Sequence, residues 1–275
     1  MAEIIFDTHS DTISNAKTQN LSALIGANRF FFYISDAQKN IINQKHYLLA
    51  QQNSLTDLTT ILETEPLLRQ SFNQTNIAID TLQFSFVPNP IYQPNLQKEY
   101  LKGISPLSKF DMVFTDEVDE LGLKNVHSID SRLFDLIERY FPVFRMYHTA
   151  TTFLRRTKRL INGDDVFVNV QPNQLNILVY KNNQFLLYNT YRYNSAEAFL
   201  YYILLMYQQF DLDTTHTPLT LMGGIMPNST IYKLLSTYIR QIKFAKRTKY
   251  YQFSPKYSNV PQQFHFDLYT MSVCE

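Results

Sequence analysis

The sequence predicts an α/β protein built from two tandem copies of a β-β-β-α-β-α-β unit. Each half opens with three short apolar or alternating runs separated by tight turns, a pattern typical of an antiparallel meander. Each meander is followed by helical periodicity that alternates with short buried-type strands, which favours an α/β sheet. This order occurs twice along the 275 residues, and such a repeat indicates a duplicated fold.

The second half shows the unit most clearly. Asn182 and Asn183 tolerate positive φ and are expected to form a hairpin turn, and Ser195 is expected to cap a helix. Gly223-Gly224 ends a short buried strand. In chain order the expected elements are strands at 165–170, 174–180 and 184–190, a helix at 196–210, a strand at 217–222, a helix at 229–239, a strand at 242–245 and a final helix at 261–271.

The first half has the same order. Ala27-Asn28 is expected to join the first two strands, and Ser131 is expected to cap a later helix. In chain order the expected elements are strands at 21–26, 29–35 and 41–49, a helix or helix pair at 54–70, an extended segment at 76–87, a short helix at 95–101, a strand at 111–115, a helix at 131–140, an extended segment at 144–147 and a helix at 149–160.

The turn-rich step Asn162-Gly163-Asp164 separates two periodic regions and predicts the boundary. We therefore expect a solvated N-terminal arm at 1–20, a first subdomain with its linker helix at 21–160, and a second subdomain at 161–275.

Composition limits the class of protein. Hydrophobic residues make up 45% and charged residues 18%, so the chain is expected to fold rather than to remain disordered. Cys274 is the single cysteine, which excludes an internal disulfide and a zinc site made of cysteines. Residues 1–20 lack the apolar region of a secretory signal, and the most apolar stretch, 198–207, is far shorter than the ~20 residues of a membrane span. The expected location is the cytoplasm.

Charge is unevenly distributed, although the net charge is only +1. Residues 1–150 hold 12 basic and 17 acidic residues, whereas residues 151–275 hold 13 and 7. This asymmetry indicates either a basic face in the second half or attraction between the halves.

The order of elements resembles the actin-like ATPase superfamily within the ribonuclease H-like fold, whose duplicated units enclose an interdomain cleft. The run from 165 to 224, with "DVFVNVQPNQLNILVYKNNQFLLYNT" and "LTLMGG", is distantly similar to the pilus-assembly protein PilM and the cell-division protein FtsA. The segments "LSALIGANRFFFYISD", "FSFVPNPIY" and "LMGG" resemble an uncharacterised bacterial domain-of-unknown-function family with this fold. The resemblance covers most of the chain from about residue 21.

The resemblance implies two phosphate loops with acidic residues and a glycine pair. By position the first loop is 24–28, with Gly26 and Asn28, but Ala23 and Leu24 stand where an acidic residue is expected. The second loop is 169–174: Asn169 takes the place of an aspartate, and Pro172 removes a donor. The residues that would contact a nucleotide, if one binds, are Gly26, Asn28, Asn169, Gln171, Asn173, Gly223 and Gly224.

These loops lack the carboxylates that organise Mg²⁺ and water, so no catalytic residue is expected. We expect a non-enzymatic binding or scaffold protein with an unidentified protein partner, and no cofactor. The alternative is weak nucleotide binding or ATPase activity, with ATP and Mg²⁺ in the cleft. The glycine pair also has a purely structural interpretation, as a strand end turning toward a helix.

Three further patterns suggest other functions. Asp7-Thr8-His9-Ser10-Asp11 has the residue types of a metal site, but no second ligand group follows, so a solvated arm is favoured. His127 and Asp130 are spaced as a base and its orienting carboxylate, without a nucleophile beside them. Basic residues near aromatic ones predict possible RNA contact, at Arg155, Arg156, Arg159, Lys246, Arg247 and Lys249.

Aromatic residues near the C-terminus allow two interpretations. Tyr250, Tyr251, Phe253 and Tyr257 would suit a protein interface if they were exposed. Core packing is the competing explanation.

Overall fold

The computed structural model describes residues 2–9, 18–50, 54–104 and 106–274. The chain divides into two compact units. Unit 1 comprises residues 1–155, 249–259 and 270–275, and unit 2 comprises residues 156–248 and 260–269. Helix α4 (Thr149–Lys158) contains the first crossing point between the units.

Unit 1 is built on a six-stranded sheet with the strand order β1-β4-β3-β2-β5-β9. The central strand β2 is antiparallel to β3 and parallel to β5, and β5 is parallel to β9. Strands β3 and β4 complete the antiparallel meander, and β1 pairs with β4 at the edge. The strands are β1 (Glu3–His9), β2 (Asn20–Gly26), β3 (Arg29–Ser35), β4 (Ile41–Leu48), β5 (Gln74–Asp80) and β9 (Arg145–His148).

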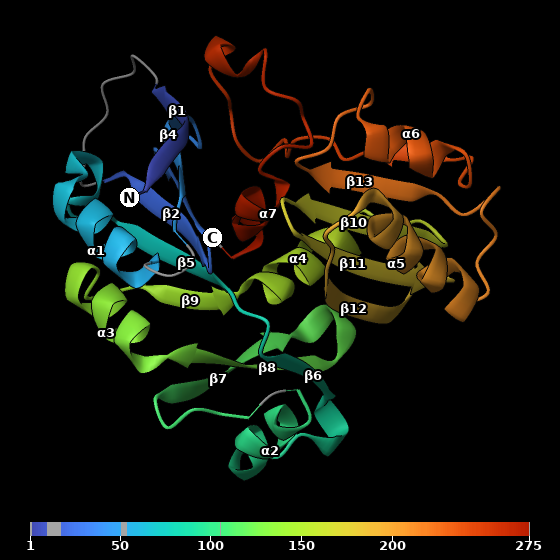
Figure 1. Cartoon of the computed structure of the whole chain (residues 1–275). Helices are drawn as coiled ribbons and strands as arrows, with labels where there is room; N and C mark the ends of the chain where they lie inside the picture. Colours follow the sequence, from blue (N-terminus) through green and yellow to red (C-terminus); the bar gives the residue numbers. More distant parts are fainter. Residues whose placement is uncertain (1, 10–17, 51–53, 105, 275) are drawn as a thin grey trace. The chain divides into compact units, whose positions relative to one another are not determined.

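One face of this sheet is covered by two helices, α1 (Ser54–Thr64) and α3 (Ser131–Tyr140), as Figure 1 shows. Alternate residues of each strand point to one face, so Phe30 and Phe32 of β3 enter the same core as Leu58 of α1 and Ile137 of α3. These side chains are almost completely buried. Burial of each such side chain contributes about 1.5–3 kcal/mol, which fixes the register of the sheet.

The opposite face of the sheet is covered by C-terminal residues of unit 1. The hydroxyl groups of Tyr33 and Tyr251 lie 2.7 Å apart, and Tyr257 donates a hydrogen bond to Gln44 at 3.2 Å. Tyr251 and Tyr257 are each only 3% exposed. Core packing is therefore the correct interpretation of these two tyrosines, whereas Tyr250 is exposed.

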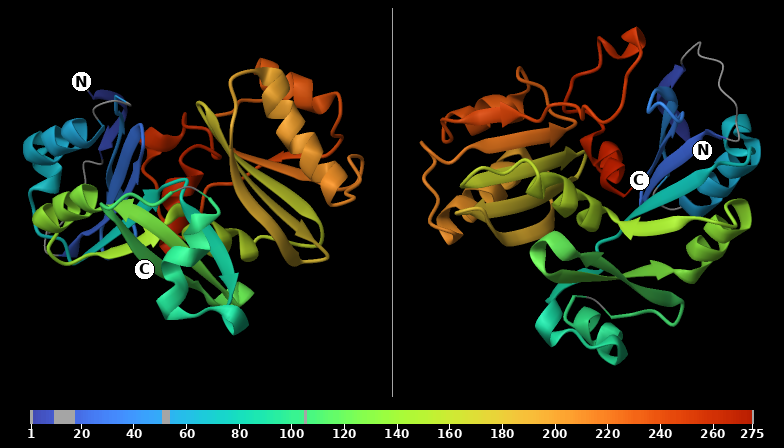
Figure 2. Two further views of the ribbon diagram at one scale, coloured as in Figure 1. Left: turned by 60° about the horizontal axis from the view of Figure 1, so that its bottom comes forward. Right: turned by 180° about the vertical axis from the view of Figure 1, so that it is seen from behind.

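Unit 1 also contains an inserted three-stranded antiparallel sheet, between β5 and α3 in the sequence, with the order β6-β8-β7. Its strands are β6 (Phe84–Pro88), β7 (Asp111–Val118) and β8 (Leu123–Asp130). Helix α2 (Gln97–Lys102) packs Leu101 against Val87 and Val126, and Figure 2 shows it beside this sheet. The described part of unit 2 has no matching insertion.

Unit 2 repeats the central sheet of unit 1, with the order β12-β11-β10-β13-β14. The central strand β10 is antiparallel to β11 and parallel to β13, just as β2 in unit 1 is antiparallel to β3 and parallel to β5. The predicted duplication is confirmed by this shared order. The strands are β10 (Asp165–Gln171), β11 (Gln174–Lys181), β12 (Gln184–Arg192), β13 (Leu219–Gly223) and β14 (Ile242–Phe244).

Local sequence signals in unit 2 act as expected. Asn182 and Asn183 have φ of 52° and 62° in the turn between β11 and β12. The Ser195 hydroxyl accepts a hydrogen bond from the Ala198 N–H and caps α5 (Ala196–Gln209). Helices α5 and α6 (Thr230–Ser236) pack on one face of the sheet, where Phe199 and Leu235 enter the core (Figure 1).

Several expectations require correction. Residues 3–9 are not a solvated arm but form β1, because Asp7 pairs with Lys45 and Thr8 donates a hydrogen bond to Tyr257. Asp130, not Ser131, caps α3 by accepting the Arg132 N–H. Strand β8 was not predicted at all. The helix expected at 261–271 is shorter, since α7 (Phe266–Tyr269) is followed by a 3₁₀ segment.

Short 3₁₀ segments complete the chain, at η2 (Pro66–Leu68), η3 (Asn89–Ile91), η4 (Pro94–Leu96), η5 (Asp119–Leu121), η6 (Pro255–Tyr257) and η7 (Thr270–Val273). In the described part of the chain, no helix is both long and apolar enough to cross a membrane.

Candidate functional site

Polar residues in unit 1 gather where the parallel strands β2 and β5 end. In parallel α/β sheets, ligands bind outside the carboxyl ends of the strands, so this edge is the first place to examine. Gly26 is the last residue of β2 and lies opposite Asp80, the last residue of β5. Asn28 lies in the turn that joins β2 to β3, and its carbonyl accepts the Leu49 N–H at 2.8 Å.

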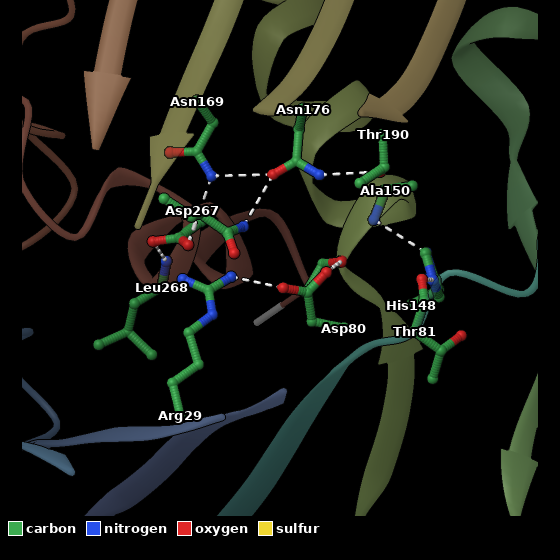
Figure 3. A network of polar contacts seen from close by, with 12 residues as sticks. Arg29, Asp80, Thr81, His148, Ala150, Asn169, Asn176, Thr190, Asp267 and Leu268 are labelled. Carbon is green, nitrogen blue, oxygen red and sulfur yellow. Dashed lines mark hydrogen bonds and ion pairs between the residues drawn. The ribbon is translucent and has the colours of Figure 1, made fainter. Parts of the chain in front are cut away.

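The Asp80 carboxylate is bound by neighbouring side chains of unit 1 (Figure 3). Arg29 Nη2 lies 2.6 Å from Asp80 Oδ2, and both side chains are 7% exposed. Thr149 donates a hydrogen bond to Asp80 Oδ1 at 3.1 Å. A Cβ atom added to Gly26 would lie 3.1 Å from Arg29 Cγ, so the arginine lies closely against the turn. The acidic group at this edge is therefore neutralised by the chain's own cation.

The strands at the corresponding edge of unit 2 carry amides in place of carboxylates. Asn176 Oδ1 accepts hydrogen bonds from Asn169 Nδ2 at 3.2 Å and from Gln171 Nε2 at 2.8 Å. Asn176 Nδ2 in turn donates to the Thr190 hydroxyl at 3.0 Å. Figure 3 shows this network at the ends of the strands. Because each amide is oriented by its neighbour, the cluster is a fixed set of neutral donors and acceptors.

The glycine pair has a conformational role at this edge. Gly223 has φ of +81°, and a Cβ atom there would lie 2.3 Å from the Val170 carbonyl oxygen. Gly224 has no such restriction, and its N–H donates to the same Val170 oxygen at 2.8 Å. Gly223 is thus required by the close contact between β10 and β13.

A third polar cluster lies inside unit 1, between the inserted sheet and the start of α4. Asp116 Oδ2 accepts hydrogen bonds from the His148 N–H and the Thr151 hydroxyl, each at 2.7 Å. His127 Nδ1 lies 4.0 Å from the same oxygen, and neither ring nitrogen of His127 has a hydrogen-bond partner among the described residues. Asp130 instead caps α3, so it is not the carboxylate that lies beside His127.

Burial controls the ionisation of this third cluster. Removal from water raises the pKa of Asp116, with His127 opposing the shift, and lowers the pKa of His127, with Asp116 opposing it. Burial also holds the pKa of His148 well below its ordinary value. His148 Nδ1 accepts the Ala150 N–H, which assigns the ring proton to Nε2 and its hydrogen bond to the Thr81 carbonyl. The rings are therefore neutral at pH 7 and serve packing and capping.

Two other sequence patterns remain, the metal-type residues near the N-terminus and the basic residues. Among the described residues, no group of three or more metal-ligating side chains could hold a metal ion, and Ser10 and Asp11 lie outside those residues. Arg155 donates to the Glu117 carbonyl, and Arg247 donates to the Val260 carbonyl. The predicted basic residues belong to both units: Arg155 and Lys249 to unit 1, and Arg156, Arg159, Lys246 and Arg247 to unit 2.

The structure brings the predicted loop residues together within each unit, and two of them act as backbone acceptors. Asn173 contributes its carbonyl to the Tyr193 N–H at 3.1 Å, and the Gln171 carbonyl accepts the Tyr193 hydroxyl. Sequence reasoning missed Arg29, Asp80 and Asn176. A signal existed for Asn176, because it interrupts an apolar strand, as Asn169 does.

Comparison with known proteins identifies both the family and the fold. The profile of a family described as "Protein of unknown function (DUF3822)" matches residues 8–242. A Bacteroides thetaiotaomicron protein with an actin-like ATPase fold and unknown function superposes with a TM-score of 0.79 at 18% identity, covering 94% of this chain and 97% of that one. The comparison with curated proteins gives no match.

A second solved structure, that of a PilM-PilN type IV pilus biogenesis complex, superposes with a TM-score of 0.56 at 11% identity, covering 93% of this chain and 98% of that one. These likenesses show that the chain has an actin-like ATPase fold. The predicted fold class and the predicted resemblance are both confirmed.

Proposed function

The chain belongs to the DUF3822 family, and from this premise we propose that it is a non-enzymatic, protein-binding module built on the actin-like fold. One observation carries the proposal: Arg29 packs against the Gly26 turn and forms an ion pair with Asp80. Hydrolysis of a nucleotide needs carboxylates that organise Mg²⁺ and water. Asp80 is engaged by Arg29 and Thr149, and the strands at the matching edge of unit 2 carry amides.

The pairing of Asp80 with Arg29 in unit 1 and the amides on the strands of unit 2 support binding rather than catalysis. Catalytic sites keep poised, incompletely satisfied groups, whereas satisfied groups stabilise the folded state. A similar fold is found in a PilM-PilN complex, in which that protein is assembled with another one. That the present chain also binds another protein is our proposal, since a shared fold alone does not determine function.

The edge strand β1 is the surface on which we place the partner. It forms one edge of the six-stranded sheet, and Ile4 and Ile5 are 50% and 49% exposed. Exposed apolar residues on an edge strand allow a partner strand to add to the sheet through backbone hydrogen bonds. The partner is thus expected to offer an extended segment with apolar side chains.

The first experiment measures phosphate release and thermal unfolding with and without saturating Mg-ATP. We expect no release above the rate without protein and no rise in Tm. A ligand at 100 times its Kd would stabilise the protein by about 2.7 kcal/mol, which is readily detected. Mg²⁺-dependent turnover that is lost in Gly224→Asp would contradict the non-enzymatic proposal.

The second experiment tests the partner surface by photo-crosslinking in cells. A photoreactive amino acid replaces Ile5, and a matched control replaces Tyr238, which is 53% exposed in unit 2. We expect a discrete protein adduct from position 5 that is absent from position 238. Equal adducts from both positions, or none from position 5, would remove β1 as the binding surface.

A further inference from the structure

The C-terminal part of the chain alternates between the two units. Residues 249–259 and 270–275 belong to unit 1, whereas Val260–Tyr269 belongs to unit 2. We call Val260–Tyr269 the C-terminal strap. It lies more than 35 residues beyond β13 in the sequence, yet it packs on the edge of unit 2 that carries the glycine turn.

The strap occupies polar groups of the glycine turn through Gln263. The Gly223 N–H donates to the Gln263 carbonyl oxygen at 2.9 Å, and Gln263 Nε2 donates to the Ile225 carbonyl oxygen at 2.9 Å. Gln263 is 5% exposed. Arg247 fixes the start of the strap through the Val260 carbonyl at 2.7 Å. A donor and an acceptor of the turn are thus satisfied by one residue of the chain itself.

The strap also places an anion against the amide cluster. Asp267 Oδ2 lies 3.5 Å from Asn169 Nδ2, and Asp267 is 7% exposed (Figure 3). Asn176 orients the Asn169 amide, so that its N–H₂ group faces the carboxylate. The oxygen of that amide, Asn169 Oδ1, is buried without a partner among the described residues. The Asn169 N–H₂ group therefore faces a negative charge, which Asp267 supplies.

We propose that the C-terminal strap is an autoinhibitory element, which fills an anion-binding edge of unit 2 with its own carboxylate and amide. An external anion, either a carboxylate or a phosphate group, reaches Asn169 and the Gly223 N–H only when the strap detaches. The inference is separate from the proposed partner surface, because β1 lies in unit 1.

The first test is hydrogen exchange of the wild-type chain, resolved by peptide mass spectrometry. An autoinhibitory strap opens without global unfolding, so its amides exchange faster than those of the sheet core. We expect the Phe264 and Tyr269 amides to exchange at least ~100-fold faster than those of β10. The Gly223 amide should exchange at the rate of the strap, because Gln263 is its acceptor. If the amides of Phe264, Tyr269 and Gly223 exchanged no faster than those of β10, the inference would be overturned, since the strap would then be a permanent part of the core.

The second test compares Asp267→Asn and Gln263→Ala with Asp211→Asn, a matched control whose side chain is fully exposed in unit 2. We expect at least ~10-fold faster strap exchange in the first two variants, with no change in β10. We also expect sodium pyrophosphate to raise the Tm of these variants but not that of the wild type or the control. Unchanged strap exchange in both variants would overturn the inference. So would faster strap exchange without pyrophosphate binding, because the freed donors would then receive no anion.

Discussion

Replacement of Gly223 by alanine tests the contact between β10 and β13, on which the geometry of unit 2 depends. At φ of +81° an L side chain is strained, and this costs about 1–2 kcal/mol. The added Cβ would also lie 2.3 Å from the Val170 carbonyl oxygen and 2.8 Å from Asn169 Oδ1. The Val170 oxygen belongs to the backbone, and the Asn169 amide is held by its hydrogen bond to Asn176, so β13 must move away from β10.

The magnitude follows from what that movement breaks. The hydrogen bond from the Gly224 N–H to the Val170 oxygen contributes about 0.5–1.5 kcal/mol. Disturbed packing of the buried neighbours Val170 and Met222 adds a further 1–2 kcal/mol, roughly. The sum is a loss of about 3–5 kcal/mol, a large fraction of the stability of an ordinary domain.

The assay is urea unfolding followed by circular dichroism, because the chain has no tryptophan. Gly224→Ala is the control: its Cβ would lie 3.7 Å from the nearest atom, and its φ is unrestricted. We expect this control to be neutral or stabilised by about 0.4–1 kcal/mol, through a less flexible unfolded chain. Equal losses in the two variants, or a loss below about 1 kcal/mol in Gly223→Ala, would refute the reasoning.

Three other changes test the buried ionisable groups. Burial raises the pKa of Asp165 to about 6, so the contribution of its protonated form to stability is complete below about pH 4 and is lost as the pH rises through 6. In urea unfolding, Asp165→Asn should therefore have a free energy of unfolding about 1–3 kcal/mol above that of the wild type at pH 7.5, but not at pH 4. The lowered pKa values of His127 and His148 have the opposite effect on the pH dependence of stability. The stability that the two neutral rings contribute is present above about pH 6.5 and is lost below it, by up to ~2.7 kcal/mol per pH unit for the pair, and the raised pKa of Asp116 offsets part of this loss. His127→Gln should reduce this acid slope by about half in urea unfolding from pH 7.5 to 5, and an unchanged slope would show that His127 does not titrate on unfolding. Arg29→Ala leaves Asp80 buried without its cation and should cost about 3–5 kcal/mol in the same assay, whereas a loss below about 1 kcal/mol would show that the ion pair does not close the turn.

Periodicity predicted most of the two central sheets, because their strands are buried on at least one face and their turns carry strong local signals. The Asn182-Asn183 turn and the Ser195 cap are examples in which the decisive contacts are local. Strand β1 was missed because its residues 3–6 show no clean alternation and its partner residues in β4 lie far away in sequence, as with Glu3 and Leu48. Strand β8 was missed because polar residues such as Asn125 and His127 are buried in it by tertiary contacts.

The candidate site was only partly predictable, for a related reason. The loop positions of Gly26, Asn169 and Gly223 follow from the order of the strands. The partners that determine their chemistry lie far away in sequence: Asp80 is 51 residues from Arg29, and Asp267 is 98 residues from Asn169. No local pattern encodes such pairs, because they depend on which strand ends the fold places side by side.

The two units differ in which parallel strand carries a glycine at its carboxyl end. In the parallel ladders, Gly26 lies opposite Asp80 in unit 1, and Val170 lies opposite Gly223 in unit 2. Each edge has therefore kept one glycine, but on different strands, and each is closed by groups of the same unit. In unit 1 an arginine lies against the glycine and binds the carboxylate, whereas in unit 2 a strap residue bonds to the glycine N–H. In unit 1 a ligand would have to replace a buried ion pair, whereas in unit 2 it would have to replace the hydrogen bonds of Gln263 and the carboxylate of Asp267, which a ligand with its own negative charge could do.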